Sequence, residues 1–297
     1  MISILILVIG VIINVALMTL SERKVMAAMQ RRIGPNKVGY LGLLQPFSDG
    51  FKLILKETIV PNYANSFIFL FSPFLFFYLA LLNWLTLPLD QGLALTELIG
   101  GGILIILTIS ELSIFGVLYS GWSSNSKYSL LGSLRSTAQM ISYSISLSLI
   151  ILTIVYTLGE INLLDIAYKQ NGFFTIFPLF PISLLFGLSI IAECNRAPFD
   201  LPEAESELVA GFMTEYSGIA FAFWFLGEYS NMIFMSSLFN LLFFGSSLPL
   251  FFLFIFIWVR ASLPRLRFDQ LLLLGWIHIL PFLIGFLLFL PFFLTLN

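Results

Sequence analysis

Residues 193–208 read E-C-N-R-A-P-F-D-L-P-E-A-E-S-E-L, and an apolar run containing Glu215 and Glu228 follows them. From Glu193 to Glu228 the chain holds seven of its 16 acidic residues and a single basic residue, Arg196. The segments on both sides of this stretch are almost entirely apolar. Because charged groups among apolar segments have a high solvation cost, we expect this acidic stretch to serve a function.

The composition is that of an integral membrane protein. Apolar residues make up 59% of the chain and charged residues only 10%, and the mean hydropathy is +1.00. A soluble domain carries about 25% charged residues. The net charge of −2 suggests no polyanion, so no nucleic-acid partner is expected. One cysteine (Cys194) and one histidine (His278) exclude an intrachain disulfide, a CxxC metal site and iron–sulfur ligation, so no metal site is expected and any redox cofactor belongs to a partner.

Long runs with no charge or a single charge predict the helices. About 20 apolar residues suffice to cross a bilayer. The run 216–259 is too long for one helix, and the Gly245 to Pro249 segment predicts a turn inside it. The sequence therefore predicts an all-α membrane protein, a single membrane domain over 1–297, with about eight transmembrane helices at 2–28, 67–87, 98–120, 136–158, 177–194, 216–241, 249–262 and 273–295.

The basic residues are distributed unevenly among the predicted loops. Loops 1–2, 3–4, 5–6 and 7–8 contain 13 of the 14, and Lys169 is the exception. Since basic loops stay on the cytoplasmic or equivalent side, all four loops should share one side, and both termini should lie on the other. Loop 1–2 also contains residues 41–57, whose pattern favours an amphipathic helix at the membrane interface. A solvated surface helix would show the same pattern.

The acidic stretch has a pattern suited to proton transfer. Asp200 followed by Glu203 resembles a capping box, and Glu203 and Glu207 would share a helix face while Glu205 points elsewhere. Glu215 continues the stripe at a spacing of four from Gly211. Coupled carboxylates at this spacing can hold and pass protons. A hydrated acidic loop is the alternative.

Two more carboxylates lie inside predicted transmembrane helices. Glu228 is about midway along helix 216–241, and Glu111 lies in helix 98–120. A central charge costs about 2.5–3.5 kcal/mol on insertion scales, so such residues usually face a polar interior or have a function. A neutral glutamic acid hydrogen-bonded to another helix is the alternative. Glu193 and Arg196 lie one turn apart, so an ion pair with a purely structural role would also explain their presence.

Seven segments carry a resemblance to a known family. They are S-E-R-K at 21–24, R-R-I-G-P-N-K-V-G at 31–39, G-L-L-Q-P-F-S-D-G-F-K-L at 42–53, G-W-S-S-N-S-K-Y-S-L-L-G at 121–132, R-S-T-A-Q-M-I-S-Y at 135–143, A-E-C-N-R-A-P-F-D-L-P-E-A-E-S-E-L-V-A-G-F at 192–212 and R-A-S-L-P-R-L-R-F-D-Q at 260–270. Through them the chain resembles chain 1 of NADH:ubiquinone oxidoreductase, respiratory complex I. The segments fall on every basic loop and together extend over nearly the whole chain.

The resemblance implies a membrane-arm heel subunit that forms much of the ubiquinone tunnel and an acidic path to the proton pump. The partners would be the peripheral quinone-module subunits, the neighbouring membrane-arm subunits and lipids, with FMN, iron–sulfur clusters and NADH bound only on those other subunits. Carried over by motif, the tunnel residues would be Arg23, Arg32, Asp49, Arg196 and Phe199. The acidic path would contain Glu193, Asp200, Glu203, Glu205, Glu207, Glu215 and Glu228.

One position departs from the family pattern. The family has S-Y-E in its fourth helix, where this chain has Ser142, Tyr143 and Ser144, while Glu111 occupies a position that is uncharged in many relatives. We therefore expect Glu111 to replace the missing carboxylate in the proton path and to point inward, toward Tyr143 and Ser144.

A composition with 33 phenylalanines suggests an AT-rich organellar genome. The resemblance then implies the mitochondrial inner membrane, with the termini on the intermembrane side and the basic loops in the matrix. A homologous subunit of a membrane-bound hydrogenase, and a stand-alone proton-coupled carrier, remain alternatives. A structural anchor without chemistry is a third, and the intramembrane carboxylates argue against it.

Overall fold

The computed structural model describes residues 2–88, 101–170, 172–200, 210–245 and 251–295. Their regular elements are all helical, which confirms the predicted all-α class. The helices are α1 (Ile2–Met29), η1 (Tyr40–Gly42), α2 (Gln45–Leu55), α3 (Ser66–Trp84), α5 (Gly102–Ser123), α6 (Lys127–Leu158), α7 (Leu163–Lys169), α8 (Phe180–Glu193), η2 (Gly211–Met213), α10 (Gly218–Phe244), α11 (Phe251–Ser262), α12 (Phe268–Leu273), η3 (Leu274–Ile279, a π-helical turn) and α13 (Leu280–Thr295).

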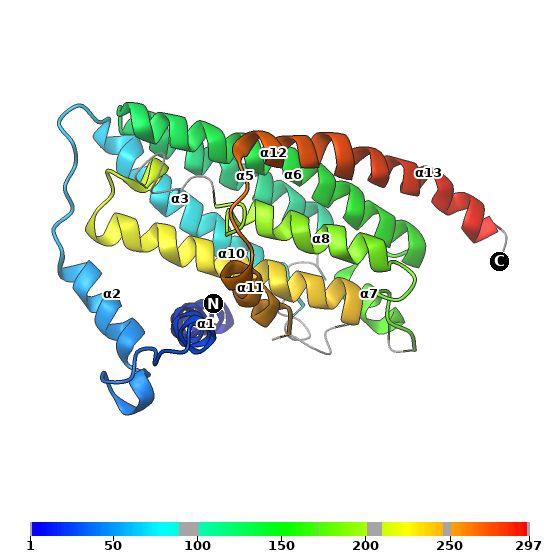
Figure 1. The fold of residues 1–297 in the computed structure, drawn as a ribbon, viewed down its shortest axis with the longest axis horizontal. Helices are drawn as coiled ribbons and strands as arrows, with labels where there is room; N and C mark the ends of the chain where they lie inside the picture. Colours follow the sequence, from blue (N-terminus) through cyan, green and yellow to red (C-terminus); the bar gives the residue numbers. More distant parts are fainter. Residues whose placement is uncertain (1, 89–100, 171, 201–209, 246–250, 296–297) are drawn as a thin grey trace.

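The long helices form a bundle. Helices α3, α5, α6, α8 and α10 run side by side, and α12, η3 and α13 continue one another along α6 (Figure 1). Helix α1 is seen nearly end-on in the same view, so its axis crosses the bundle steeply, and it contacts α2, α10 and α11. Helix α2 also contacts α10, so α1, α2 and α10 are neighbours in the fold.

Five of the described helices are long and apolar enough to cross a membrane: Leu5–Met29, α3, α5, α6 and Phe268–Phe292. Helices α8 and α11 are apolar but shorter, and the 27-residue α10 contains Glu228, Asn231 and Asn240. These eight segments correspond to the eight predicted ranges, and the number that actually span stays a prediction. Parts of two predicted helices, 98–100 and 249–250, lie outside the described residues.

Helix α6 begins nine residues before its predicted start. The predicted boundary lay at 136 because residues 127–135 begin and end with a charge, Lys127 and Arg135. These residues are nevertheless helical, since Ser129, Gly132 and Ser133 are buried against neighbouring segments. A side chain on Gly132 would lie 2.6 Å from the Cα of Gly211, so this contact requires glycine. At about 1.5 Å per residue the 32-residue helix exceeds the hydrocarbon thickness.

The core has two parts. The larger lies between α6, α8, α10 and α11 and includes the fully buried rings of Phe186, Phe234 and Phe243. The smaller surrounds Trp224, and in it Tyr216 shares a 2.9 Å hydrogen bond with Ser72. Burial raises the pKa of Tyr216, which precedes α10, to about 12, so this hydroxyl remains protonated at any physiological pH.

Hydrogen bonds join predicted loops 1–2, 3–4, 5–6 and 7–8 to one another. At the end of the bundle where α3 begins, Asn65 N–H donates to Ser123 O (3.0 Å) and Ile59 N–H donates to the Ser217 hydroxyl (3.0 Å). The amide N–H of Leu266 donates a hydrogen bond of 3.1 Å to Pro198 O and so joins loops 5–6 and 7–8. Lys169 pairs with Glu160 (2.9 Å) beside α7, at the opposite end of the bundle (Figure 1). This arrangement agrees with the predicted grouping of the basic loops.

Candidate functional site

A buried ion pair joins the first and last thirds of the chain. Glu22 of α1 is 2% exposed and pairs with Arg260 of α11. Tyr229 of α10 donates a hydrogen bond of 2.6 Å from its hydroxyl to the other carboxylate oxygen of Glu22. Because both oxygens of the buried carboxylate have donors, its desolvation is compensated and three helices are held at one point.

The helical period of α1 explains the burial of Glu22. Val11, Val15, Met18 and Glu22 follow one another at spacings of four, three and four, and all four are at most 4% exposed. These spacings place them on one face of a helix. The glutamate therefore continues the apolar stripe that packs on α10 and α11.

A second buried pair lies beside the first. The guanidinium of Arg196 is 3.6 Å from the carboxylate of Glu228, and its central carbon lies 4.3 Å from the ring centroid of Tyr229. The side chains of Arg196 and Glu228 are 6% and 10% exposed. A cavity of 10 Å³, about the size of one water molecule, lies between Glu22, Arg196 and Arg260. Two carboxylates and two guanidiniums thus form a charge-balanced cluster around one tyrosine.

The segment that carries Arg196 is fixed at several points. Gln139 of α6, which is fully buried, donates from Nε2 to Ala192 O (2.8 Å) and Phe199 O (3.0 Å). Asp200 is 4% exposed and accepts a hydrogen bond from Arg265 (3.3 Å). The ring of Phe199 lies 6.1 Å from that of Tyr143, whose hydroxyl donates to Leu271 O (3.0 Å). These contacts hold residues 192–200 against α6 and the start of α12.

A cavity of 280 Å³ opens between α1, α2 and α10. Its walls are mostly apolar, and its polar side chains are Thr19, Arg23, Asp49 and Tyr229. Arg23 pairs with Asp49 at 2.7 Å, and Gln45 also donates to Asp49 (3.0 Å). The apolar residues of the cavity wall are Val15, Ala16, Pro46, Gly50, Leu53, Phe221, Ala222, Phe225 and Leu226. Apolar walls with a few placed polar groups are typical of sites for small organic molecules.

The structure brings some of the predicted site residues together and separates others. Arg23 and Asp49 line the cavity, and Arg196 and Glu228 form the adjacent cluster. Glu193 is buried at the end of α8, with no hydrogen-bond partner for its Oε2 among the described residues. Glu215 is half-buried between η2 and α10, and the exposed Arg32 donates to Gln30 (2.8 Å) away from the cavity. Glu203, Glu205 and Glu207 lie outside the described residues.

The predicted inward orientation of Glu111 is wrong. The side chain of Glu111 is exposed, whereas Ser144 is 5% exposed with its hydroxyl bonded to Ile141 O (3.0 Å). The small buried residues Ser110, Ser113, Gly116, Val117 and Ser120 occupy the inner face of α5. Since successive residues point about 100° apart on a helix, Glu111 falls on the outer face beside Ser110. It still interacts electrostatically with Glu193.

Sequence reasoning missed Glu22, Gln139, Tyr229 and Arg260. Glu22 lies inside the predicted helix 2–28 and was noted only as part of the S-E-R-K segment, although its spacing from Val15 and Met18 indicates the buried face of that helix. Arg260 was counted only as a loop charge, yet it is the one basic residue of the apolar helix α11. Gln139 and Tyr229 carry no sequence signal that separates them from ordinary polar residues of buried helices.

Chemically, the arrangement couples a cavity to buried charges. Tyr229 lines the cavity, donates to Glu22 and lies under Arg196, which pairs with Glu228. In a low-dielectric interior, a change of charge in the cavity acts strongly on such neighbours. The fold and this site define an α-helical membrane protein in which a mostly apolar cavity adjoins a cluster of buried, paired charges.

Comparison with known proteins gives the family. Residues 2–291 match the NADH dehydrogenase family, and the chain belongs to it. It is 58% identical over 287 residues to the NADH-ubiquinone oxidoreductase chain 1 of Hyaloraphidium curvatum, and the match covers 97% of this chain and 96% of that protein. Identity is 50% to the protein of the same name from Chondrus crispus, covering 95% of this chain and 92% of that protein. It is 49% to the protein of the same name from Arabidopsis thaliana, covering 93% and 90%.

Proposed function

We propose that this chain is the membrane subunit of a proton-pumping NADH:ubiquinone oxidoreductase that forms part of the quinone tunnel and the beginning of the acidic path. Nearly full-length relatives with that name support the assignment to the complex. FMN, the iron–sulfur clusters and the NADH site belong to partner subunits in this proposal. The complex lies in the mitochondrial inner membrane, with the basic loops of this chain in the matrix.

One observation carries the proposal: Tyr229 belongs to both the cavity and the buried charge cluster. The cavity of 280 Å³ is close to the lower limit of about 300 Å³ for small-molecule sites. Its apolar wall suits an isoprenoid tail, and the Arg23–Asp49 pair suits the polar head of a quinone. A quinone in transit would therefore pass directly beside Tyr229.

The residues of the chain then transmit the state of the quinone. Reduction of ubiquinone to ubiquinol takes up two electrons, supplied by a partner subunit, and two protons. Uptake of electrons before protons makes the head more negative and attracts the Arg196 guanidinium, which weakens its 3.6 Å pairing with Glu228. The charge balance around Glu228 changes as this pairing weakens, which couples the carboxylate to the state of the quinone. Glu193, Asp200, Glu203, Glu205, Glu207 and Glu215 continue the path in this proposal.

A cavity-filling substitution tests the proposal. Leu53→Trp in α2 adds bulk to the cavity wall, while Ile54→Trp adds the same bulk to an exposed neighbour on the same helix (59% exposed). We expect Leu53→Trp to raise the KM for ubiquinone about tenfold or more and Ile54→Trp to leave it unchanged. Reduction of an artificial acceptor by NADH, which bypasses the quinone, serves as the assembly control. If the complex were intact and Leu53→Trp had the same KM for ubiquinone as Ile54→Trp, the proposal would be contradicted.

A further inference from the structure

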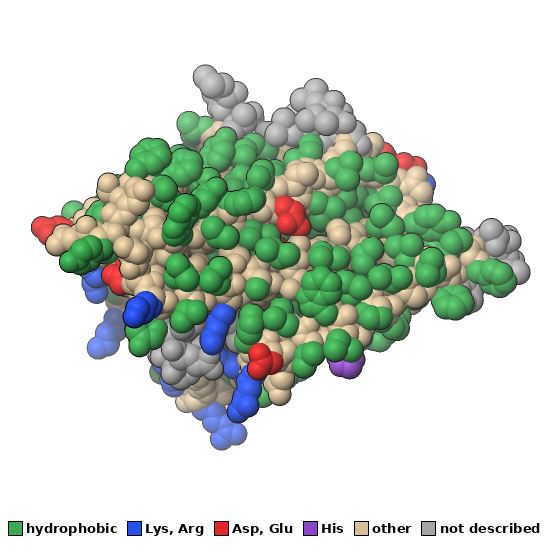
Figure 2. All heavy atoms as spheres, turned by 90° about the horizontal axis from the view of Figure 1, so that it is seen from above, with side chains coloured by type: hydrophobic (Ala, Val, Ile, Leu, Met, Phe, Trp, Pro, Cys, Tyr) green, Lys and Arg blue, Asp and Glu red, His purple; other side chains and the backbone are tan. Residues whose placement is uncertain are grey.

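The outer face of α5 carries a charge at the depth of the membrane. Leu104, Thr108, Glu111, Phe115 and Trp122 are all exposed and follow one another at helical spacings of three, four and seven. Glu111 is the tenth of the 22 residues in α5. At a rise of about 1.5 Å per residue it lies close to the middle of a hydrocarbon layer about 30 Å thick. Figure 2 shows one face of the molecule, where hydrophobic side chains predominate and acidic side chains are few.

Nothing in the described part of the chain neutralises this carboxylate. The structure gives Glu111 no hydrogen bond or ion pair within residues 2–88, 101–170, 172–200, 210–245 and 251–295. Glu193, which interacts electrostatically with Glu111, is also acidic and supplies no counter-charge. A polar group that faces lipid without a partner is unfavourable in either protonation state.

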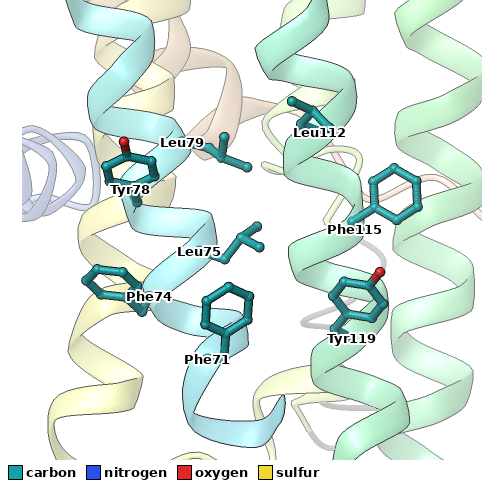
Figure 3. Close-up of a pocket in the computed structure, with 8 residues that line it drawn as sticks. All are labelled: Phe71, Phe74, Leu75, Tyr78, Leu79, Leu112, Phe115 and Tyr119. Atoms are coloured by element: carbon teal, nitrogen blue, oxygen red, sulfur yellow. The ribbon is translucent and has the colours of Figure 1, made fainter. Parts of the chain in front are cut away.

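An apolar groove adjoins Glu111. A cavity of 590 Å³ lies between α3 and α5, and its wall includes Leu112 and Phe115, which are one and four residues after Glu111. Figure 3 shows the aromatic and leucine side chains of both helices along this space. Phe71, Phe74 and Tyr78 of α3 are 42–52% exposed, so the groove is open to the surroundings of the chain. Ridges of side chains from another helix fit grooves of this kind.

The carboxylate distinguishes between the possible occupants of the groove. An acyl chain would fill the apolar part but has no hydrogen-bond donor at the middle of the bilayer, because lipid headgroups lie about 15 Å away at the interface. A helix from another protein can supply both apolar side chains and a donor at that depth. Polar residues in membrane helices usually have such partners across the interface.

We infer that the α3–α5 groove and Glu111 together form a docking surface for a transmembrane helix of another subunit of the complex. That helix carries a basic or amide side chain facing Glu111, and its apolar residues fill the groove. This docking is a matter of assembly and does not depend on whether the acidic residues transfer protons.

Cross-linking in the intact complex identifies the occupant. Phe115→Cys provides a thiol in the groove for a benzophenone maleimide, and the natural Cys194 is buried and serves as the background control. Leu288→Cys, an exposed position on α13 (71% exposed), is the matched control. Illumination should join Phe115→Cys, and not Leu288→Cys, to an apolar peptide of a different subunit that contains Lys, Arg, Asn or Gln. Adducts only with lipid, or with a second copy of this chain, would overturn the inference.

Substitution of Glu111 tests the charge complementarity. Glu111→Gln keeps polar atoms at the site, whereas Glu111→Leu removes them and leaves a residue that is favourable in a membrane helix. As the detergent concentration is raised, without cross-linking, the Glu111→Leu complex should lose the subunit identified above about tenfold more readily than the parent complex. The Glu111→Gln complex should be intermediate. Retention of that subunit by Glu111→Leu to the same extent as the parent would show that Glu111 makes no contact with it.

Discussion

The hydroxyl of Tyr229 donates a hydrogen bond of 2.6 Å to the carboxylate of Glu22, which joins α10 to α1 across 207 residues of sequence. The ring of the same tyrosine lies 4.3 Å from the guanidinium carbon of Arg196, and its side chain lines the 280 Å³ cavity. The hydroxyl and the ring therefore have separable roles. One fixes a buried carboxylate, and the other forms the wall between the cavity and the charged cluster.

Tyr229→Phe separates these roles. The ring remains under Arg196, but Glu22 loses one of its two donors, at a cost of about 1.5–3 kcal/mol for a hydrogen bond to a charged group. We expect lower ubiquinone reduction, with unchanged NADH oxidation by an artificial acceptor. Tyr156→Phe on α6, where the ring is 50% exposed, is the control and should behave as the parent. A Tyr229→Phe complex with parental ubiquinone turnover would remove the hydroxyl from the coupling.

Gln139→Leu should loosen the segment that carries Arg196. The substitution leaves the carbonyl groups of Ala192 and Phe199 without their buried donor. Each unsatisfied group costs about 1–3 kcal/mol, so amide hydrogen exchange of residues 194–200 should accelerate about tenfold or more. Thr157→Val, which removes only a hydrogen bond within α6, is the control and should leave this segment protected. Equal protection in both variants would show that other contacts suffice to hold the segment.

The acidic path predicts the effect of a charge-neutralising pair of substitutions. Glu203→Gln with Glu207→Gln should reduce quinone-coupled turnover and proton pumping while the complex still assembles, because Gln keeps the size of Glu and its capacity for hydrogen bonds but cannot bind and release a proton. Glu57→Gln, an exposed acidic residue of another loop, should leave both activities unchanged. Normal pumping by the assembled double variant would show that Glu203 and Glu207 have no part in proton transfer.

The basic loops should share one side of the membrane. Hydrogen bonds between residues 59–65 and residues 123 and 217 support the grouping of loops 1–2, 3–4 and 5–6. In sealed inner-membrane vesicles, an impermeant thiol reagent should reach Lys37→Cys and Lys127→Cys from the matrix side and Lys169→Cys from the other. The buried Cys194 gives little background. Labelling of Lys37→Cys and Lys127→Cys from opposite sides would overturn the predicted topology.

The fold class followed from the sequence because apolar runs such as those of α3 and α10 have no other stable form in a membrane. The start of α6 could not be predicted, since its first nine residues contain two charges and are packed closely, as at Gly132 on Gly211. Among the site residues, Arg196, Glu228 and the Arg23–Asp49 pair were predicted from charge and motif. Glu22, Gln139 and Arg260 were missed because their roles depend on partners that are 53 to 238 residues away.

The ion pair between Glu22 and Arg260 also has a consequence for biogenesis. A ribosome adds about 5–20 residues per second, so Arg260 follows Glu22 into the membrane only after about 12–48 s. Tyr229, the other donor to Glu22, is also made late. Throughout that interval α1 carries an acidic group that no partner has yet reached. Helix α1 can therefore complete its buried contacts only after α10 and α11 have been synthesised.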